Sequence, residues 1–261
     1  MQNVTDQTRN PFGMRPDCRS FVPGYGDANA EFHVVGDHPG VHGGVENGVP
    51  FTGEPWSAAF LSALSEAGLI GGLADGVSPD GTVAPSSETA AATDGDATTD
   101  GDATTDGDAA TTGGDAATTD GRGAEPEPVR TKCTYFSYLH MCVPDGEPTA
   151  ASYDDMERFF DAELRAIAAH VLLPVGARAT EHVLEQYTAR AWKTEIDMDA
   201  LHAEELLGSG WLVVPVKDPA EWEAGDADRL VDALRELQST DFRRESDLGR
   251  FMAGREPYLV R

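Results

Sequence analysis

The chain has 261 residues, 40% of them hydrophobic, and 46 Asp and Glu against 19 Lys and Arg give a formal charge of −27. This length corresponds to one large domain or two small ones, and the hydrophobic fraction excludes a wholly disordered chain. No apolar run approaches the roughly 20 residues that cross a bilayer, and the start lacks a signal-peptide pattern, so we expect a cytoplasmic protein without a membrane partner. Three cysteines, an odd number, argue against the disulfide framework of a small secreted protein.

Two elements are predicted in the first part of the chain, residues 1–75. Phe32–Gly36 is a short apolar run that ends in a glycine-rich loop, which is typical of a buried strand. From Trp56 to Leu69 the apolar side chains recur at helical spacing, which predicts a helix with one buried face.

Residues 76–128 form a low-complexity segment built on an imperfect repeat of Thr-Asp-Gly-Asp-Ala-Thr. It has too few apolar residues to offset the entropy of ordering, so we expect a disordered acidic insertion. The alternative is calcium binding, but the repeat lacks the final Glu of an EF-hand and the paired glycines of a β-roll. Residues 74–121 carry 11 acidic and no basic side chains, and 16 of the 19 cations are arginines. An acidic surface with little lysine leads us to expect a halophilic protein.

Strands and helices alternate after the insertion. The predicted strands are Tyr135–Met141, Val171–Val175 and Trp211–Val216, and the predicted helices are Tyr153–His170, Ala177–Trp192 and Asp226–Leu237. Crossovers of this length return each strand in the same direction, so we expect a three-layer α/β/α domain around a central four-stranded, mainly parallel sheet. Residues 129–240 complete the domain and 241–261 form a C-terminal tail. Ligands of such sheets bind at the carboxyl ends of the strands, where the loops after Gly36, Met141, Val175 and Val216 should meet.

The first of these loops carries a recognisable motif. Residues 34–54 read VVGDHPGVHGGVENGVPFTGE, and residues 142–149 read CVPDGEPT. The first stretch resembles the first motif of the uracil-DNA glycosylase superfamily, closest to its thermostable bacterial and archaeal branches, and the second resembles that family's Cys-x-Pro-Pro loop. The resemblance implies hydrolysis of the N-glycosidic bond of uracil or another deaminated base flipped from DNA. DNA containing a damaged base, or a nucleotide, would be the partner of a monomeric chain.

The resemblance also implies roles for residues of this sequence. Asp37, His38 and Glu54 are the catalytic candidates, because the reaction needs an activated water and a charge that offsets a developing sugar cation. Phe51 matches the phenylalanine that stacks on the base, and the glycines let backbone amides approach it. The full set of base-binding candidates is Gly36, Pro39, Gly40, His42, Gly43, Gly44, Phe51, Tyr138, Lys217 and Asp218.

Two positions depart from the family pattern. Asp218 stands where the last motif, His-Pro-Ser, has its histidine, although the neighbouring Lys217 could supply the missing donor. Tyr138 stands where one branch has an asparagine that reads the pyrimidine edge. Either the specificity has moved, or this is an altered member that binds nucleotide or nucleic acid without cleavage.

Several relatives hold a four-iron cluster on four cysteines, but this sequence supplies too few ligands. Cys142 matches the third ligand position, Phe159 occupies the fourth, and Cys133 has no counterpart. A site of three cysteines completed by His140 is the alternative. Because a cluster needs four thiolates or an explicit substitute, we expect that the iron–sulfur cluster of the relatives is lost and that no cofactor is required.

Overall fold

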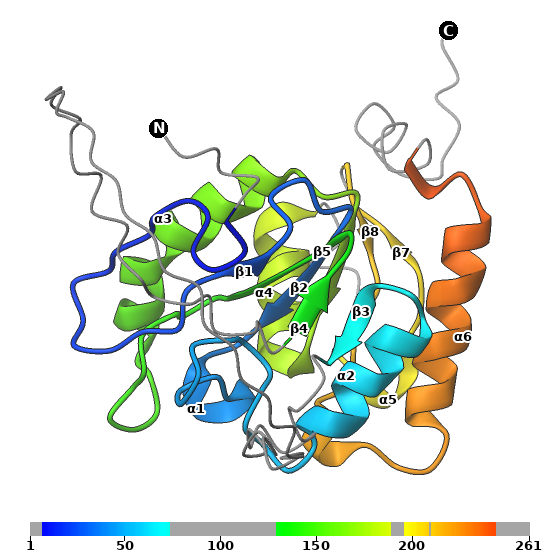
Figure 1. Ribbon diagram of the computed structural model, residues 1–261, viewed down its shortest axis with the longest axis horizontal. Helices are drawn as coiled ribbons and strands as arrows, with labels where there is room; N and C mark the ends of the chain where they lie inside the picture. The colour runs from blue at the N-terminus through cyan, green and yellow to red at the C-terminus, as the bar shows by residue number, and fades with distance from the viewer. Residues whose placement is uncertain (1–6, 74–128, 189–195, 209, 244–261) are drawn as a thin grey trace, which may run out of the picture.

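A computed structural model describes residues 7–73, 129–188, 196–208 and 210–243 (Figure 1). The expected insertion at 76–128 therefore lies outside the described residues, and so does the tail from 244 onward. Within the described ranges, no helix is both long and apolar enough to cross a membrane.

The central sheet has six strands in the order β1-β5-β2-β6-β8-β7. Its inner four strands, β5, β2, β6 and β8, are mutually parallel, which confirms the predicted parallel core. The edge strands β1 and β7 pair antiparallel, and neither was predicted, because no apolar run like Trp211–Val216 surrounds them. The strands are Tyr25–Gly26 (β1), Phe32–Gly36 (β2), Thr134–Tyr138 (β5), Val171–Pro174 (β6), Leu206–Leu207 (β7) and Leu212–Val213 (β8).

The four predicted helices are present, with shifted ends. The helices are Pro39–His42 (α1), Ser57–Glu66 (α2), Ala150–Ile167 (α3), Gly176–Tyr187 (α4), Met198–Leu201 (α5) and Asp226–Ser239 (α6), with a 3-10 turn at Pro219–Glu221 (η3). Helix α3 begins three residues before the prediction because the Thr149 side chain caps it, accepting a hydrogen bond from the backbone N–H of Ser152. It ends at Ile167 because Ala168 adopts a left-handed conformation. The last residues of the helix predicted to Trp192 lie outside the described residues.

Alternating side chains of the inner strands bury the two faces of the sheet. Val34 and Leu173 pack in one cluster with residues of α2 and α6. Val35 and Leu172 pack in another with residues of α3 and α4. Successive side chains of each strand thus point to opposite faces, and each face is covered by helices, as Figure 1 shows. The predicted three-layer α/β/α architecture is confirmed.

A separate two-stranded ribbon lies where the chain leaves and re-enters the domain. Strands β3 (Ile70–Leu73) and β4 (Val129–Thr131) pair antiparallel on either side of residues 74–128. The hydroxyl of Tyr25 donates to the carbonyl of Val129 over 2.7 Å, which ties the ribbon to the core. Loop-closure entropy grows slowly with loop length, so a ribbon that holds both ends together can accommodate a long insertion.

One acidic side chain is buried in the core beneath α3. Glu163 accepts a hydrogen bond over 2.9 Å from the hydroxyl of Tyr135, and its second oxygen, Oε2, has no partner among the described residues. Burial raises the pKa of Glu163 from 4.5 to about 7, against the opposing effect of hydrogen bonds from Tyr135 and the Gly24 amide. Ionised Glu163 is therefore a destabilising charge at neutral pH.

The Glu163→Gln variant should show less loss of stability at high pH than the wild type. The pKa of Glu163 is higher in the folded protein than in the unfolded chain, so protonated Glu163 contributes to the stability of the fold. This contribution is fully present below about pH 4.5 and is lost as the pH rises through about 7. Between pH 5 and pH 8 the wild type should lose about 2.5 kcal/mol relative to the variant. Denaturant unfolding of both proteins at several pH values measures this difference, and parallel pH profiles would contradict the buried-acid interpretation.

Candidate functional site

The loops that follow the parallel strands meet at one end of the sheet, as expected from the topology. Asp37 directly follows β2, and one of its carboxylate oxygens lies 3.3 Å from Nε of Arg178 in the first turn of α4. His42, at the end of α1, lies 3.6 Å from the carboxylate of Asp218, which caps η3 after β8. The contacts join three strand ends that are distant in sequence, and they define the candidate site.

The glycines of the first motif allow a tight loop. At Gly36 a Cβ would lie 2.6 Å from the ring of Tyr138 and 2.8 Å from that of Phe51. Gly43 has a φ of +75°, and a Cβ there would lie 2.2 Å from the carbonyl oxygen of Thr52. A side chain at Gly36 would displace these buried rings, and one at Gly43 would require a shift of the backbone.

The amides of this loop are already engaged within the protein. Gly40 donates to Nδ1 of His38 over 3.1 Å, and Gly44 donates to the carbonyl of Thr52 over 2.7 Å. Gly43 donates to the carbonyl of Pro39, the first residue of α1, over 3.0 Å. Recognition of a base by these glycine amides stays a prediction, and it requires the loop to rearrange.

Asp37 is held by two side chains that the sequence did not single out. Its carboxylate accepts a hydrogen bond from the hydroxyl of Tyr153 and pairs with Arg178, which also contacts Glu147 over 3.3 Å. The pKa of Tyr153 is raised, first by burial and then by Asp37. The Asp37 carboxylate is therefore largely committed to structure. Arg178 could have been suspected from its place four residues after the end of β6, but nothing local marks Tyr153.

His38 is buried beside a second histidine, His140. The His38 side chain caps α1, and burial lowers its pKa, so the ring is neutral at neutral pH, although Asp37 and Glu147 act in the opposite direction. The ring of His140 lies edge-to-face with that of His38, with centroids 6.5 Å apart. The ring of Tyr153 also packs edge-to-face on His140, with centroids 5.4 Å apart.

His42 and Asp218 form a second polar pair. Nδ1 of His42 accepts a hydrogen bond from the Asp37 amide over 2.9 Å, so the ring proton is on Nε2, which faces Asp218. Burial would raise the pKa of Asp218, but the contact with His42 and a hydrogen bond from the Ala220 amide outweigh it and lower the pKa. Asp218 is therefore an ionised carboxylate, and the N–H of His42 at Nε2 faces it.

The side chain of Lys217 forms its ion pairs away from the His42–Asp218 pair. Its ammonium group lies 2.6 Å from a carboxylate oxygen of Asp199 and 3.6 Å from one of Asp226, and its amide donates to His202. To supply a donor in place of the missing histidine, Lys217 would have to leave both carboxylates. Its predicted role in base binding is not favoured by this geometry.

Phe51 and Tyr138 are both part of the core. The Phe51 ring is fully buried among aromatic rings, with centroids 5.5 Å from His42, 5.2 Å from Phe60 and 5.6 Å from Tyr138. The Tyr138 hydroxyl donates to the carbonyl of His42 over 2.7 Å and accepts from the Phe51 amide over 3.0 Å. Burial raises the pKa of Tyr138, so this hydroxyl stays protonated. A base that stacks on Phe51 requires one of these neighbours to move.

Glu54 is the least committed of the three catalytic candidates. It is half-buried, and its Cγ lies 3.0 Å from where a Cβ of Gly43 would stand, so it borders the glycine loop. Its amide donates to the hydroxyl of Ser57 over 3.0 Å, while its carboxylate has no hydrogen bond or ion pair with the described residues. Glu54 can therefore respond to charge on a ligand without first breaking a contact with the described residues.

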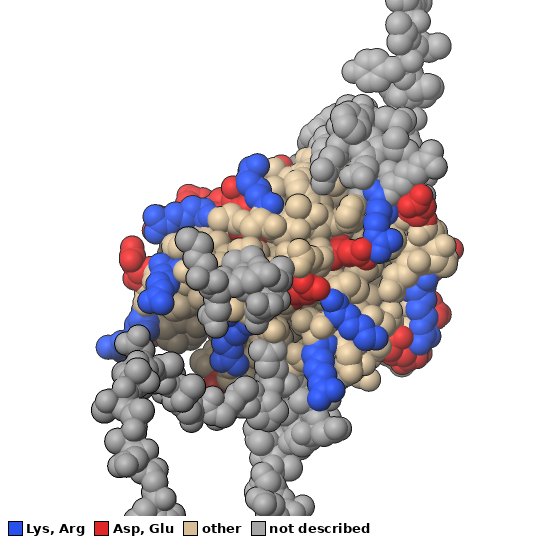
Figure 2. Space-filling model, turned by 45° about the horizontal axis from the view of Figure 1, so that its top comes forward, with Lys and Arg blue, Asp and Glu red and all other residues tan. Residues whose placement is uncertain are grey.

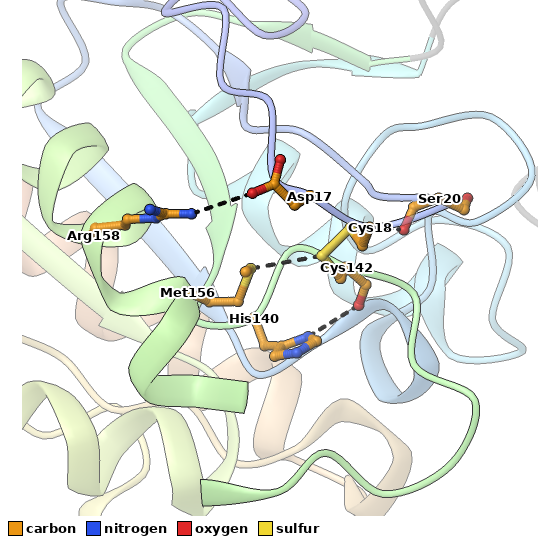
Figure 3. Close-up of a disulfide and its surroundings, with 7 residues drawn as sticks. All are labelled: Asp17, Cys18, Ser20, His140, Cys142, Met156 and Arg158. Atoms are coloured by element: carbon orange, nitrogen blue, oxygen red, sulfur yellow. Dashed lines mark hydrogen bonds and ion pairs between the residues drawn. A yellow bond between two sulfur atoms is a disulfide. The ribbon is translucent and has the colours of Figure 1, made fainter. Parts of the chain in front are cut away.

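A disulfide joins Cys18 to Cys142 beside the site, which the odd cysteine count did not lead us to expect (Figure 3). It fastens the N-terminal segment to the loop after β5, where Val22 donates to the carbonyl of Met141 over 2.8 Å and Val143 to that of Ser20 over 2.9 Å. Figure 3 shows the ring of His140 beside the carbonyl of Cys142.

The residues around Cys142 do not fit an iron–sulfur cluster. The Cys142 sulfur is bonded to Cys18, and Cys133 is the third cysteine, at a distant position before β5. Phe159, at the fourth ligand position, packs against Cys142 and Met156. Among the described residues no group of three or more His, Cys, Asp or Glu side chains is arranged to hold a metal ion, including the alternative with His140.

Comparison with known proteins places this arrangement in a family. The model of the uracil DNA glycosylase superfamily matches residues 23–238. One similar protein is a type-5 uracil-DNA glycosylase of Thermus thermophilus, 42% identical over 59 residues, a match that covers 23% of this chain and 25% of the relative. The match to this relative thus spans about a quarter of its length. Since the family model covers most of the chain, including every strand of the central sheet, the protein belongs to the uracil DNA glycosylase superfamily.

Proposed function

We propose that the protein is a DNA base-excision glycosylase that hydrolyses the N-glycosidic bond of uracil or another deaminated base flipped out of DNA. The observation that supports this best is the first-motif loop, which brings Asp37, His38 and Glu54 to the end of the sheet where Asp218 also lies. This hydrolysis needs an ionised carboxylate to stabilise the cation that develops on the sugar. It also needs a neutral imidazole to position and activate the water.

A second candidate function is binding of nucleotide or nucleic acid without cleavage. The packing of Phe51 favours it, because a flipped base normally stacks on an aromatic face and this ring is fully enclosed. The Tyr138 ring fills the space beside Gly36. A Cβ added at Gly36 would lie only 2.6 Å from this ring. An enzyme with this site must move Tyr138 or recognise the base elsewhere in the loop.

The charge distribution favours recognition through the loop over long-range steering of DNA. On the face in Figure 2, basic and acidic side chains are interspersed. Several cations are paired with carboxylates, among them Arg178, Arg229 and Arg235. In salt near 1 M the Debye length is only about 3 Å, so the net charge of −27 does little to repel a ligand that is held by direct contacts.

The test is an assay at molar potassium chloride on single- and double-stranded oligonucleotides that contain uracil, hypoxanthine or xanthine. Alkaline scission of the product reveals abasic sites, and undamaged oligonucleotides of the same sequence are the control. We expect cleavage of at least one modified strand, unchanged by a chelator because we propose that no cofactor is required. Retention of the oligonucleotide without any abasic product would instead support the binding function.

A further inference from the structure

His38 and His140 form a pair whose hydrogen bonds fix the proton on each ring. They follow β2 and β5, adjacent parallel strands, and both side chains are at least 95% buried. The two rings contact each other edge-to-face, with centroids 6.5 Å apart. The Leu139 amide donates to the Gly36 carbonyl and the His140 amide to the Asp37 carbonyl, so the two loops are joined at their backbones.

The His38 ring presents a proton donor. Its Nδ1 accepts the hydrogen bond from the Gly40 amide, so Nδ1 carries no proton and the neutral ring must carry it on Nε2. This Nε2 is buried and has no hydrogen-bond partner among the described residues. A buried donor without a partner costs free energy, and it is therefore a feature that a bound group would satisfy.

The His140 ring presents the complementary acceptor. Its Nδ1 lies 3.0 Å from the carbonyl oxygen of Cys142, and since a carbonyl only accepts, Nδ1 must carry the proton. In the neutral ring Nε2 is then a free lone pair. The carbonyl that orients His140 belongs to a residue held by the disulfide to Cys18. A backbone carbonyl behind the ring also stabilises the imidazolium that forms when Nε2 takes a proton.

We infer that His38 and His140 bind the hydrolytic water between them, with His38 donating to its oxygen and His140 acting as its general base. This inference rests on the proposed glycosylase function. Asp37 is less suited to be the base, because its carboxylate is engaged by Tyr153 and Arg178. A single water needs one donor and one acceptor at fixed positions, which is what the two opposite tautomers supply.

The proposed step balances without any further reactant. The water oxygen forms a bond to the anomeric carbon of the sugar while its proton passes to Nε2 of His140. The bond between that carbon and the base nitrogen breaks, and its electron pair leaves with the base. The base ends with one proton taken from solvent, His140 returns its proton to solvent, and the sugar keeps a hydroxyl.

Asparagine and glutamine variants separate this role from a structural one. An Asn side chain can replace Nδ1 of histidine but not Nε2, whereas a Gln side chain reaches the position of Nε2. His38→Asn and His140→Asn should therefore keep the bonds to Gly40 and Cys142, and with them the thermal stability, but lose at least 100-fold in the single-turnover cleavage rate. His38→Gln should retain more activity than His38→Asn, because it still offers a donor. If both Asn variants cleave at the wild-type rate, the pair does not act on the water.

A measurement that does not need activity tests the tautomers themselves. Nitrogen NMR of histidine-labelled wild-type protein should show His38 protonated on Nε2 and His140 protonated on Nδ1. The same tautomer on both rings would overturn the inference even if the enzyme is active. Absence of cleavage by the wild type on every modified strand would overturn the proposed function together with it, whereas normal cleavage with the wrong tautomers would overturn this inference alone.

Discussion

Replacing Cys18 with Ser should lower the free energy of unfolding by about 2–4 kcal/mol and the thermal midpoint by about 10 °C. The disulfide joins residues 124 positions apart, so the loop that it closes in the unfolded chain is long. In the chain-entropy model a loop of this size gives close to 5 kcal/mol, and measured values usually fall below that ceiling. Cys18 is half-buried while Cys142 is buried, so changing Cys18 removes the bond with the smaller change in packing.

The free cysteine and a reductant supply the controls for this experiment. Cys133 is not in the disulfide, so Cys133→Ser should unfold close to the wild type. Reductant should destabilise the wild type by the same amount as the Cys18 variant and should not destabilise that variant further. A wild type that is insensitive to reductant, with a Cys18 variant of equal stability, would show that the bond does not form in the protein.

The parallel core could be predicted because each of its parts has a local pattern. Phe32–Gly36 is apolar throughout, as a strand covered on both faces must be, and α3 repeats its buried side chains at helical spacing. The edge strands and the β3–β4 ribbon could not, since none of them lies in an apolar run as long as Val171–Val175 or Trp211–Val216. Thr149 offered a capping signal for the start of α3 that the apolar pattern alone misses.

The candidate site was predictable where its residues lie in the family motifs, and the sheet topology brought the distant Asp218 beside His42. Asp37 and His38 lie in one continuous motif, so the resemblance implied both. Tyr153 and Arg178 reach Asp37 only because α3 and α4 cover the same face of the sheet, and a helix pattern does not say which side chains project past its end. The pairing of Cys18 with Cys142 is a contact across the fold, and one pair among three cysteines cannot be chosen from spacing.

Replacing Glu54 with Gln should lower the rate of base release by about 100-fold, which corresponds to about 2.7 kcal/mol of transition-state stabilisation. The Glu54 carboxylate has no partner among the described residues, so its negative charge is available to offset the cation that develops on the sugar. Gln has the same shape without the charge. Because no contact with the described residues is lost, the free energy of unfolding should change by less than about 0.5 kcal/mol. Single-turnover cleavage and denaturant unfolding measure the two effects.

Asp37→Asn is the control variant matched to Glu54→Gln, and we expect it to lose stability. The same change of charge weakens the contacts of Asp37 with Tyr153 and Arg178, so we expect a loss of about 1–2 kcal/mol in stability. Any loss of activity in this variant should follow from displacement of the neighbouring His38. A stable Asp37→Asn protein without activity, beside a fully active Glu54→Gln protein, would transfer the charge-stabilising role from Glu54 to Asp37.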